Sequence, residues 1–243
     1  PHKRVDLFLR ALALAAKKSP HALHALVIGA GAERNHLEQL ANELAIAPAV
    51  TFLERVPEIP PYLQQVADIH ILTSSEEGFG LSVVEAAACG LPNIVSASGA
   101  LTEVVQNGID GIHVLSAQPE AFADAILQLS ENPALRERMG NAGRAQAVAK
   151  FSVAAYKHNM LQQLRRVEPT KSDPALHEAH PIRHTIPALP SSAHRIAAAR
   201  HVPERVRRPC RRRVAVIAFE VVDREGHVPR RGTAGGRTVV AGP

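Results

Sequence analysis

Residues 24–45 read HALVIGAGAERNHLEQLANELA, and this stretch decides the fold. Its apolar start ends at a glycine, which is typical of a short buried strand. The residues that follow place apolar side chains at the spacing of an amphipathic helix. A strand that leads directly into a helix is the repeating unit of α/β proteins, so we predict that class.

The same alternation continues on both sides of this stretch. Apolar spacing predicts a helix over 5–16, and strands and helices then take turns as far as residue 117. Parallel strands joined by helices form a doubly wound sheet covered on both faces, which binds ligands at the carboxyl ends of its strands. We therefore expect a single Rossmann-like parallel sheet. Beyond residue 45 the expected strands are 49–54, 69–75, 93–98 and 111–116, and the expected helices are 60–67, 81–89 and 101–106.

Three more helical segments, 119–130, 134–151 and 153–166, complete a domain that we place at residues 1–167. Beyond them the pattern ends, because prolines recur among histidines and arginines. We predict that residues 168–243 form a basic tail that is largely disordered. One apolar run over 214–222, VAVIAFEVV, has strand character, but a strand without a partner is not stable in water.

The formal net charge of +5 is distributed unevenly along the chain. Residues 1–167 hold 14 Lys and Arg against 16 Asp and Glu, whereas the last 76 residues hold 14 against 7. The mildly acidic domain does not favour nucleic acid, so we expect no such partner. The run RRPCRRR, residues 207–213, has the charge to touch nucleic acid or anionic lipid, but solvated charge is the simpler interpretation.

Cysteines and apolar runs restrict the class of protein further. Cys89 and Cys210 lie far apart, so we expect neither a disulfide framework nor a metal site, and a cytoplasmic location fits. No apolar run reaches the roughly 18 residues of an integral membrane segment, and a peripheral position at the inner membrane face stays open. Because the chain starts at Pro1 without a methionine, we expect it to begin partway through a longer protein.

The segment SSEEGFGLSVVEAAACGLP, residues 74–92, carries the chemistry. It joins a strand end through a glycine-flanked turn to a helix start, where unpaired N–H groups favour a phosphate. Gly78 and Gly80 let a ligand approach the backbone closely, and Phe79 offers an apolar wall. Glu77 and Glu85 flank the turn, and a carboxylate can accept hydrogen bonds from two vicinal hydroxyls. The arrangement predicts a site for a nucleotide sugar.

Two glutamates separated by seven residues, within EGFGLSVVEAAACGLP, resemble the donor-binding motif of the retaining glycosyltransferase family four, which has the GT-B fold. KRVDLFLRA, LVIGAGAERNHLEQLA and EVVQNGIDGIHV resemble other segments of that family in the same order. The resemblance covers about residues 3–155 and matches the C-terminal, nucleotide-sugar-binding half of the fold. It implies a hexosyltransferase type of enzyme, without a separate cofactor, that moves a sugar from a UDP, GDP or ADP donor to a sugar or lipid-linked acceptor.

The resemblance also implies roles for three charged residues. Glu85 would hold the ribose hydroxyls, and Glu77 would hold hydroxyls of the transferred sugar beside the reacting carbon. Lys3 resembles the lysine that neutralises the charge developing on the leaving phosphate, so Glu77 and Lys3 are the predicted catalytic residues. Two departures accompany this match, because Arg4 and Glu54 stand where the family usually has glycine.

Backbone contacts follow from the same resemblance. Gly80, Leu81 and Ser82 would donate N–H groups to the diphosphate. Residues near Arg55 and Val56, just after a predicted strand, would contact the base of the nucleotide.

Several interpretations remain open at this stage. One alternative is that Glu77 and Glu85 are solvated acids at the end of a helix. Another is that they form the acid pair of a glycosidase, but that interpretation would leave the phosphate-binding turn between them unexplained. The family's N-terminal domain, which binds the acceptor, is absent from the sequence, so the chain can be a donor-binding fragment that needs that domain as its partner. The chain can also be a related GT-B epimerase or phosphorylase, or an interaction protein that acts through its basic tail.

Overall fold

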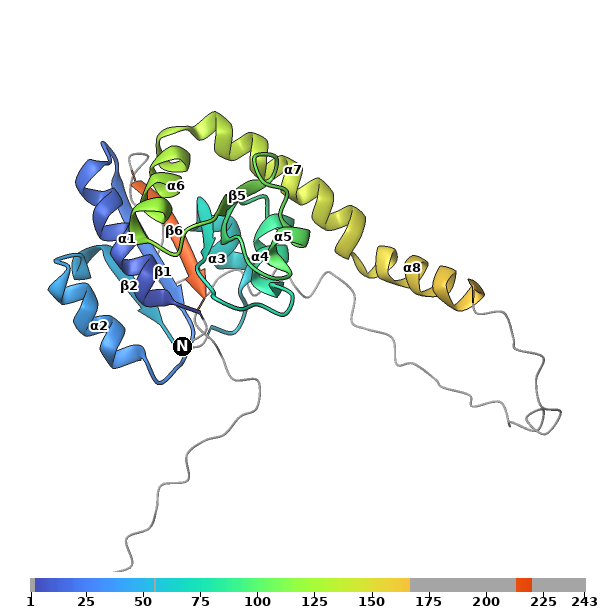
Figure 1. Cartoon of the computed structure of the whole chain (residues 1–243), viewed down its shortest axis with the longest axis horizontal. Helices are drawn as coiled ribbons and strands as arrows, with labels where there is room; N and C mark the ends of the chain where they lie inside the picture. Colours follow the sequence, from blue (N-terminus) through green and yellow to red (C-terminus); the bar gives the residue numbers. More distant parts are fainter. Residues whose placement is uncertain (1–2, 55, 167–212, 220–243) are drawn as a thin grey trace, which may run out of the picture.

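The computed structural model describes residues 3–54, 56–166 and 213–219, which form one α/β unit. Its parallel sheet has six strands in the order β2-β1-β6-β3-β4-β5 (Figure 1). Every neighbouring pair is parallel, so the predicted Rossmann-like sheet is confirmed. The strands are β1 (Ala22–Ile28), β2 (Val50–Leu53), β3 (Ile69–Leu72), β4 (Asn93–Ser96), β5 (Gly111–Val114) and β6 (Arg213–Phe219).

Helices cover both faces of the sheet. On one face α1 and α6 bury Phe8 and Phe122 completely, and α2 packs beside them. On the other face α3 and α4 bury Leu63 and Val83, with α5 alongside. The helices are α1 (Val5–Lys18), α2 (Arg34–Glu43), α3 (Pro60–Gln65), α4 (Leu81–Ala88), α5 (Leu101–Val104), α6 (Pro119–Glu131), α7 (Pro133–Phe151) and α8 (Val153–Arg166), with a 3-10 turn at Ala47–Ala49.

Strand β6 lies in the middle of the sheet, between β1 and β3. All seven of its residues are in register with β1, and its central residues are also in register with β3. Val216 points into the core on the α1 side and Ile217 into the core on the α3 side, and both are 0% exposed. The expectation that this run would have no partner strand was therefore wrong. Burial on both faces and hydrogen bonds on both edges stabilise it.

The position of β6 makes the strand order that of a doubly wound sheet. The order matches 3-2-1-4-5-6 when β6 occupies the first position, although it comes last in the sequence. The sheet thus combines a segment beyond residue 212 with the predicted domain of residues 1–167. Residues 167–212 and 220–243, for which we predict disorder, lie outside the described residues.

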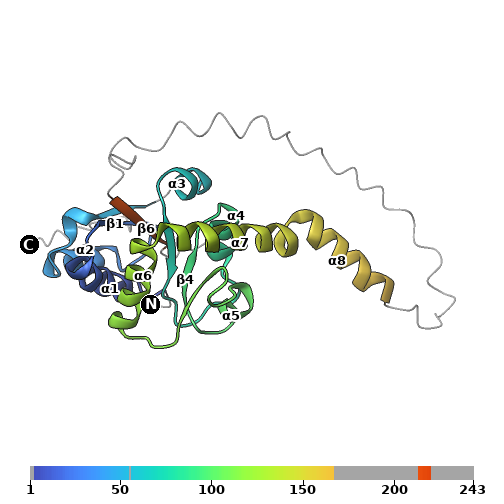
Figure 2. The ribbon, with the colours of Figure 1, turned by 90° about the horizontal axis from the view of Figure 1, so that it is seen from above.

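A short break separates α6 from α7. Asn132 caps α7, because its side chain accepts a hydrogen bond from the N–H of Leu135 at 2.9 Å, and Pro133 occupies a first-turn position. From there α7 runs along α4, and α8 continues beyond it and projects away from the sheet (Figure 2). Of the three helices after residue 118, α6 and α7 pack against the rest of the α/β unit, and α8 extends beyond it.

Candidate functional site

The predicted motif forms the turn between β3 and α4, at the carboxyl edge of the sheet. Gly80 is the residue before α4 and has a φ of 82°, which L side chains rarely adopt. A Cβ there would also lie 2.7 Å from Cδ2 of Leu101, so a side chain at this position would have to displace the end of that leucine in addition to adopting the strained φ. The Gly80 carbonyl accepts a hydrogen bond from the N–H of Val83 at 2.9 Å, and Gly80, the residue before the helix, has no side chain with which to cap it. The N–H groups of Leu81 and Ser82 belong to this helix start, which suits an anion.

Lys3 and Glu77 meet at this edge although 74 residues separate them. Nζ of Lys3 lies 2.5 Å from Oε2 of Glu77, and the two side chains are 24% and 15% exposed. The hydroxyl of Ser74, at the base of the turn, lies 3.5 Å from the same carboxylate oxygen. The fold thus brings together the two residues that the resemblance marks as catalytic, and it leaves both accessible to a ligand.

The loop before α5 supports the turn from one side. Ser98 donates a hydrogen bond of 3.4 Å to the carbonyl of Ser74. A Cβ at Gly99 would lie 3.2 Å from the carbonyl of Glu77, so the backbones approach closely at that point. Glu77 is therefore held by contacts from another part of the chain as well as by its own strand.

The other residues of the motif lie on the open side of the turn. Glu85 is exposed on α4, and Leu81 and Phe79 are 48% and 42% exposed. Phe79 packs edge-on against Phe151 at the end of α7, with 5.6 Å between ring centroids. A Cβ at Gly78 would have no neighbour within 4 Å, so the space beside this backbone is open.

The predicted base contact is only partly covered by the structure. Arg55 lies outside the described residues. Val56 follows β2 and packs, half-buried, against the apolar cluster around α3. Its role beside a nucleotide base stays a prediction.

Electrostatics at this edge can be read from the charges that meet there. The ammonium group of Lys3 and the N-terminal end of α4 are both positive, and they flank one carboxylate, that of Glu77. Two positive groups suit a diphosphate, whereas a carboxylate accepts hydrogen bonds from sugar hydroxyls. The geometry is thus suited to a ligand that carries both a diphosphate and a sugar.

Comparison with known proteins shows the family to which the chain belongs. Residues 1–146 match the sequence profile of a family described as glycosyl transferases group 1. The chain belongs to this family.

Individual relatives give the same assignment. D-inositol 3-phosphate glycosyltransferases of Streptomyces griseus and Corynebacterium jeikeium are 34% and 38% identical to it over 162 and 157 residues. These matches cover 60% and 62% of this chain but only 33% and 37% of the relatives, so the chain spans about a third of their length.

Solved structures show the same fold. Sucrose-phosphate synthase from Thermosynechococcus elongatus matches with a TM-score of 0.56 and 30% identity, over 65% of this chain and 41% of the other. The C-terminal domain of a glycosyl transferase group 1 family protein from Francisella tularensis matches with a TM-score of 0.57 and 25% identity, over 63% of this chain and 81% of that domain. The predicted GT-B type of fold, and its C-terminal half, are consistent with both.

Two buried polar residues of this group 1 domain were not predicted from the sequence. The hydroxyl of Thr73 contacts the main chain just before α1, and His70 lies in β3 with Nδ1 2.7 Å from Oδ1 of Asn93 in β4. Burial lowers the pKa of His70 to about 4, the hydrogen bond to Asn93 opposes this shift, and the charge of Lys3 adds to it. The sequence signal was a polar residue directly after an apolar strand for Thr73, and a histidine between two isoleucines within the strand for His70.

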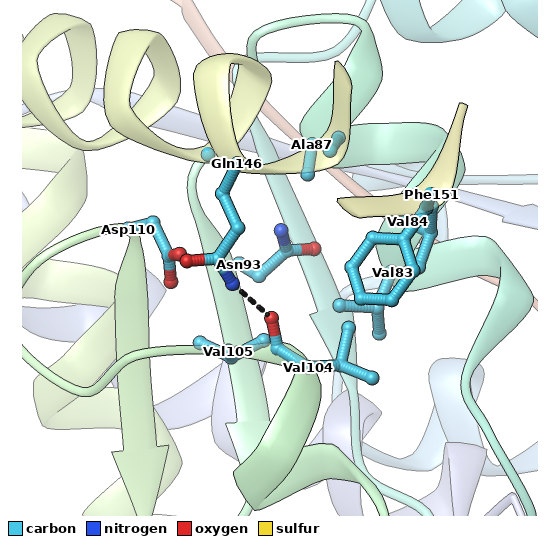
Figure 3. Close-up of a pocket in the computed structure, with 11 residues that line it drawn as sticks. Val83, Val84, Ala87, Asn93, Val104, Val105, Asp110, Gln146 and Phe151 are labelled. Carbon is cyan, nitrogen blue, oxygen red and sulfur yellow. Dashed lines mark hydrogen bonds between the residues drawn. The ribbon is translucent and has the colours of Figure 1, made fainter. Parts of the chain in front are cut away.

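A pocket lies between α4, α5 and α7 (Figure 3). Valines of α4 and α5 make up much of its wall, and Gln146 of α7 crosses it to donate a hydrogen bond of 2.8 Å to the carbonyl of Val104. Asp110, also in the wall, has a raised pKa because it is buried. None of the predicted site residues lines this pocket, so we regard it as part of the packing between α4 and α7.

Potential metal ligands are dispersed over the described part of the chain. Residues 3–54, 56–166 and 213–219 contain no group of three His, Cys, Asp or Glu side chains placed to hold a metal ion. Over the same ranges no helix has the length and hydropathy of a membrane span.

Proposed function

We propose that this chain contains the donor-binding domain of a retaining hexosyltransferase that uses a nucleotide-diphosphate sugar. The observation that carries the proposal is the Lys3–Glu77 pair beside the start of α4. A cationic side chain, a helix N-terminus and a carboxylate converge there, which suits a diphosphate joined to a sugar.

The mechanism is electrostatic in this proposal. As the bond between the sugar and the diphosphate breaks, negative charge grows on the leaving phosphate oxygens. Lys3 and the N–H groups of Leu81 and Ser82 stabilise that charge, while Glu77 orients the sugar through its hydroxyls. Glu85, one to two turns into α4, holds the ribose.

Related proteins support a nucleotide sugar as the donor. The HepE protein of Anabaena, solved in complex with UDP and glucose, matches with a TM-score of 0.61 and 25% identity over 69% of this chain and 46% of its own. The D-inositol 3-phosphate glycosyltransferases are named for sugar transfer. UDP is therefore the first donor nucleotide to test, before GDP and ADP.

The first experiment is calorimetric titration of the full chain with UDP, GDP, ADP and their glucose derivatives. We expect saturable binding of one nucleotide, weakened at least about tenfold by Glu85→Ala, because the ribose loses its carboxylate acceptor. Glu131→Ala is the matched control, since Glu131 is an exposed glutamate at the end of α6. A folded protein that binds none of these ligands would refute the donor site.

A second candidate follows from the coverage of the relatives. The chain spans about a third of the length of these relatives. In this second candidate, the acceptor-binding site lies in the part of the relatives that this chain does not match. The chain would then bind donor without transferring sugar. Transfer from the labelled donor, measured with and without the N-terminal half of a relative, separates the two candidates. Carbon NMR of the product would report retention, and epimerised donor or phosphate-dependent sugar release would indicate an epimerase or a phosphorylase.

A further inference from the structure

Thr73 connects the end of β3 to the start of α1. It follows β3 directly and is 4% exposed. Its hydroxyl oxygen lies 2.9 Å from the carbonyl oxygen of Lys3 and 2.8 Å from that of Arg4. A hydroxyl has one hydrogen to donate, so the two carbonyls share it or alternate as acceptors. The hydroxyl thereby ties two consecutive peptide groups of a distant segment to the strand end.

The tied segment has an unfavourable backbone conformation. Arg4 has φ 50° and ψ 44°, in the left-handed region that residues with a Cβ rarely adopt. Its carbonyl also accepts hydrogen bonds from Leu7 at 3.0 Å and Phe8 at 3.3 Å, which start α1. Surrounding structure must hold such a residue in place, and the Thr73 hydroxyl is one of the groups that does so.

The same strand end also leads to Glu77. Glu77 lies four residues after Thr73, and its carboxylate pairs with the ammonium group of Lys3. The main-chain carbonyl of the same Lys3 accepts a hydrogen bond from the Thr73 hydroxyl. The position of Lys3 relative to Glu77 therefore depends on a main-chain contact at Thr73 as well as on the ion pair itself. Loss of the hydroxyl would free the backbone of Lys3 while leaving both charged groups present.

We propose that Thr73 is a positioning residue of the donor site, which holds the strained start of α1 so that Lys3 reaches the diphosphate. This inference rests on the proposed function, because it assigns to Lys3 a phosphate contact. Thr73 itself touches no ligand and acts through Lys3.

Thr73→Val tests the proposal, because valine keeps the shape and removes the hydroxyl. We expect about tenfold weaker binding of UDP or of whichever nucleotide the wild type binds, and Thr73→Ser should restore affinity to within about threefold. Thr51→Val, on the partly exposed strand β2, is the control and should leave affinity unchanged. Equal affinity of Thr73→Val and wild type would overturn the proposal.

A double-mutant cycle separates positioning from packing. If Thr73 acts through Lys3, Thr73→Val has no further effect on nucleotide affinity in a Lys3→Ala background. Arg4→Gly should recover most of the affinity lost in Thr73→Val, because glycine adopts a positive φ without strain. Additive losses in the first pair, or no recovery in the second, would show that Thr73 serves packing alone.

Hydrogen exchange provides a readout that does not require a ligand. In Thr73→Val the amides of Leu7 and Phe8, which bond to the Arg4 carbonyl, should exchange faster than in the wild type, and those of α6 should not change. Unchanged exchange at Leu7 and Phe8 would refute the positioning role. If the wild type binds no nucleotide, the proposed function fails, while this measurement still decides whether Thr73 holds the start of α1.

Discussion

Strand β6 and helix α8 both lie beyond residue 146, where the family match ends, yet their apolar side chains have opposite environments. Val216 and Ile217 of β6 are 0% exposed, whereas Tyr156 and Leu164 of α8 are 62% and 61% exposed. Both segments have apolar residues at a regular spacing. An apolar pattern thus indicates which side chains of a segment can be buried. Whether they are buried depends on which neighbouring elements the fold places against them.

The two segments, β6 and α8, have different kinds of neighbour in the fold. β6 has β1 on one edge, β3 on the other and helices over both faces, so its central residues are paired on both sides and buried on both faces. Among the described elements, α8 packs mainly against the preceding helix, α7, and Val153 and Met160 are among its exposed side chains. A helix satisfies its own backbone and tolerates an uncovered face, but a central strand does not.

A buried charge in β6 should have the largest effect on this comparison. We expect Ile217→Asp to lower the free energy of unfolding by about 4 kcal/mol or more, because a carboxylate without a partner would enter the core. Leu164→Asp, the same change on the exposed face of α8, should alter it by less than about 0.5 kcal/mol. Urea denaturation of the full chain followed by circular dichroism measures both. Similar effects at the two positions would show that β6 is not a core strand in solution.

A pH titration gives the next largest effect, through a histidine beside β6. His70 is in register with Ile217 and is buried, and its pKa is lowered from 6.5 to about 4. Between these two values the unfolded chain binds a proton that the folded protein excludes, so stability falls as pH falls from 6.5 to 4. We expect a loss of at most about 3 kcal/mol, from urea denaturation at several pH values.

The variant His70→Gln is the control for this titration. It should flatten the slope of stability against pH, even if the variant is less stable overall, because the proton excluded by the folded protein is the one on His70. If His70→Gln and the wild type show the same slope, the buried environment assigned to His70 would be incorrect.

The smallest effect on stability is expected at α8 itself. Replacing Tyr156 and Leu164 together by lysine should change the free energy of unfolding by less than about 1 kcal/mol, because both side chains are already in solvent. A large loss would mean that this face is covered in solution. Light scattering with the same pair of proteins tests whether a second copy is the cover, since lysines would then lower the apparent mass.

Much of the fold was predictable because it depends on local patterns. Most strand starts, the helix starts and the two-face burial of the sheet follow from apolar spacing and from prolines at helix starts, such as Pro119 and Pro133, whereas β2 to β5 end one to three residues earlier than predicted. The turn at Gly80 was also predictable, because a glycine before a helix start indicates an unusual φ and a close approach. The charged site residues required the family resemblance in addition.

Contacts across the chain were not predictable in this way. The role of Thr73 depends on a hydroxyl that reaches the main chain 70 residues earlier, next to a residue with a left-handed φ. The exclusion of the proton from His70 depends on the complete burial of its side chain within the fold. Neither residue has a neighbour in the sequence that would distinguish it from an ordinary strand residue.

Local sequence patterns were enough to predict the α/β class and the glycine turn before α4, because each depends on residues within about ten positions of one another. The contact between Lys3 and Glu77 and the central place of residues 213–219 in the sheet became visible in the tertiary structure alone. A strand pairs with whichever strand edges are free as the chain folds. The residues of a single strand do not specify which other strand will be its neighbour. An apolar run of seven residues is therefore compatible with a tail or a core until its neighbours are known.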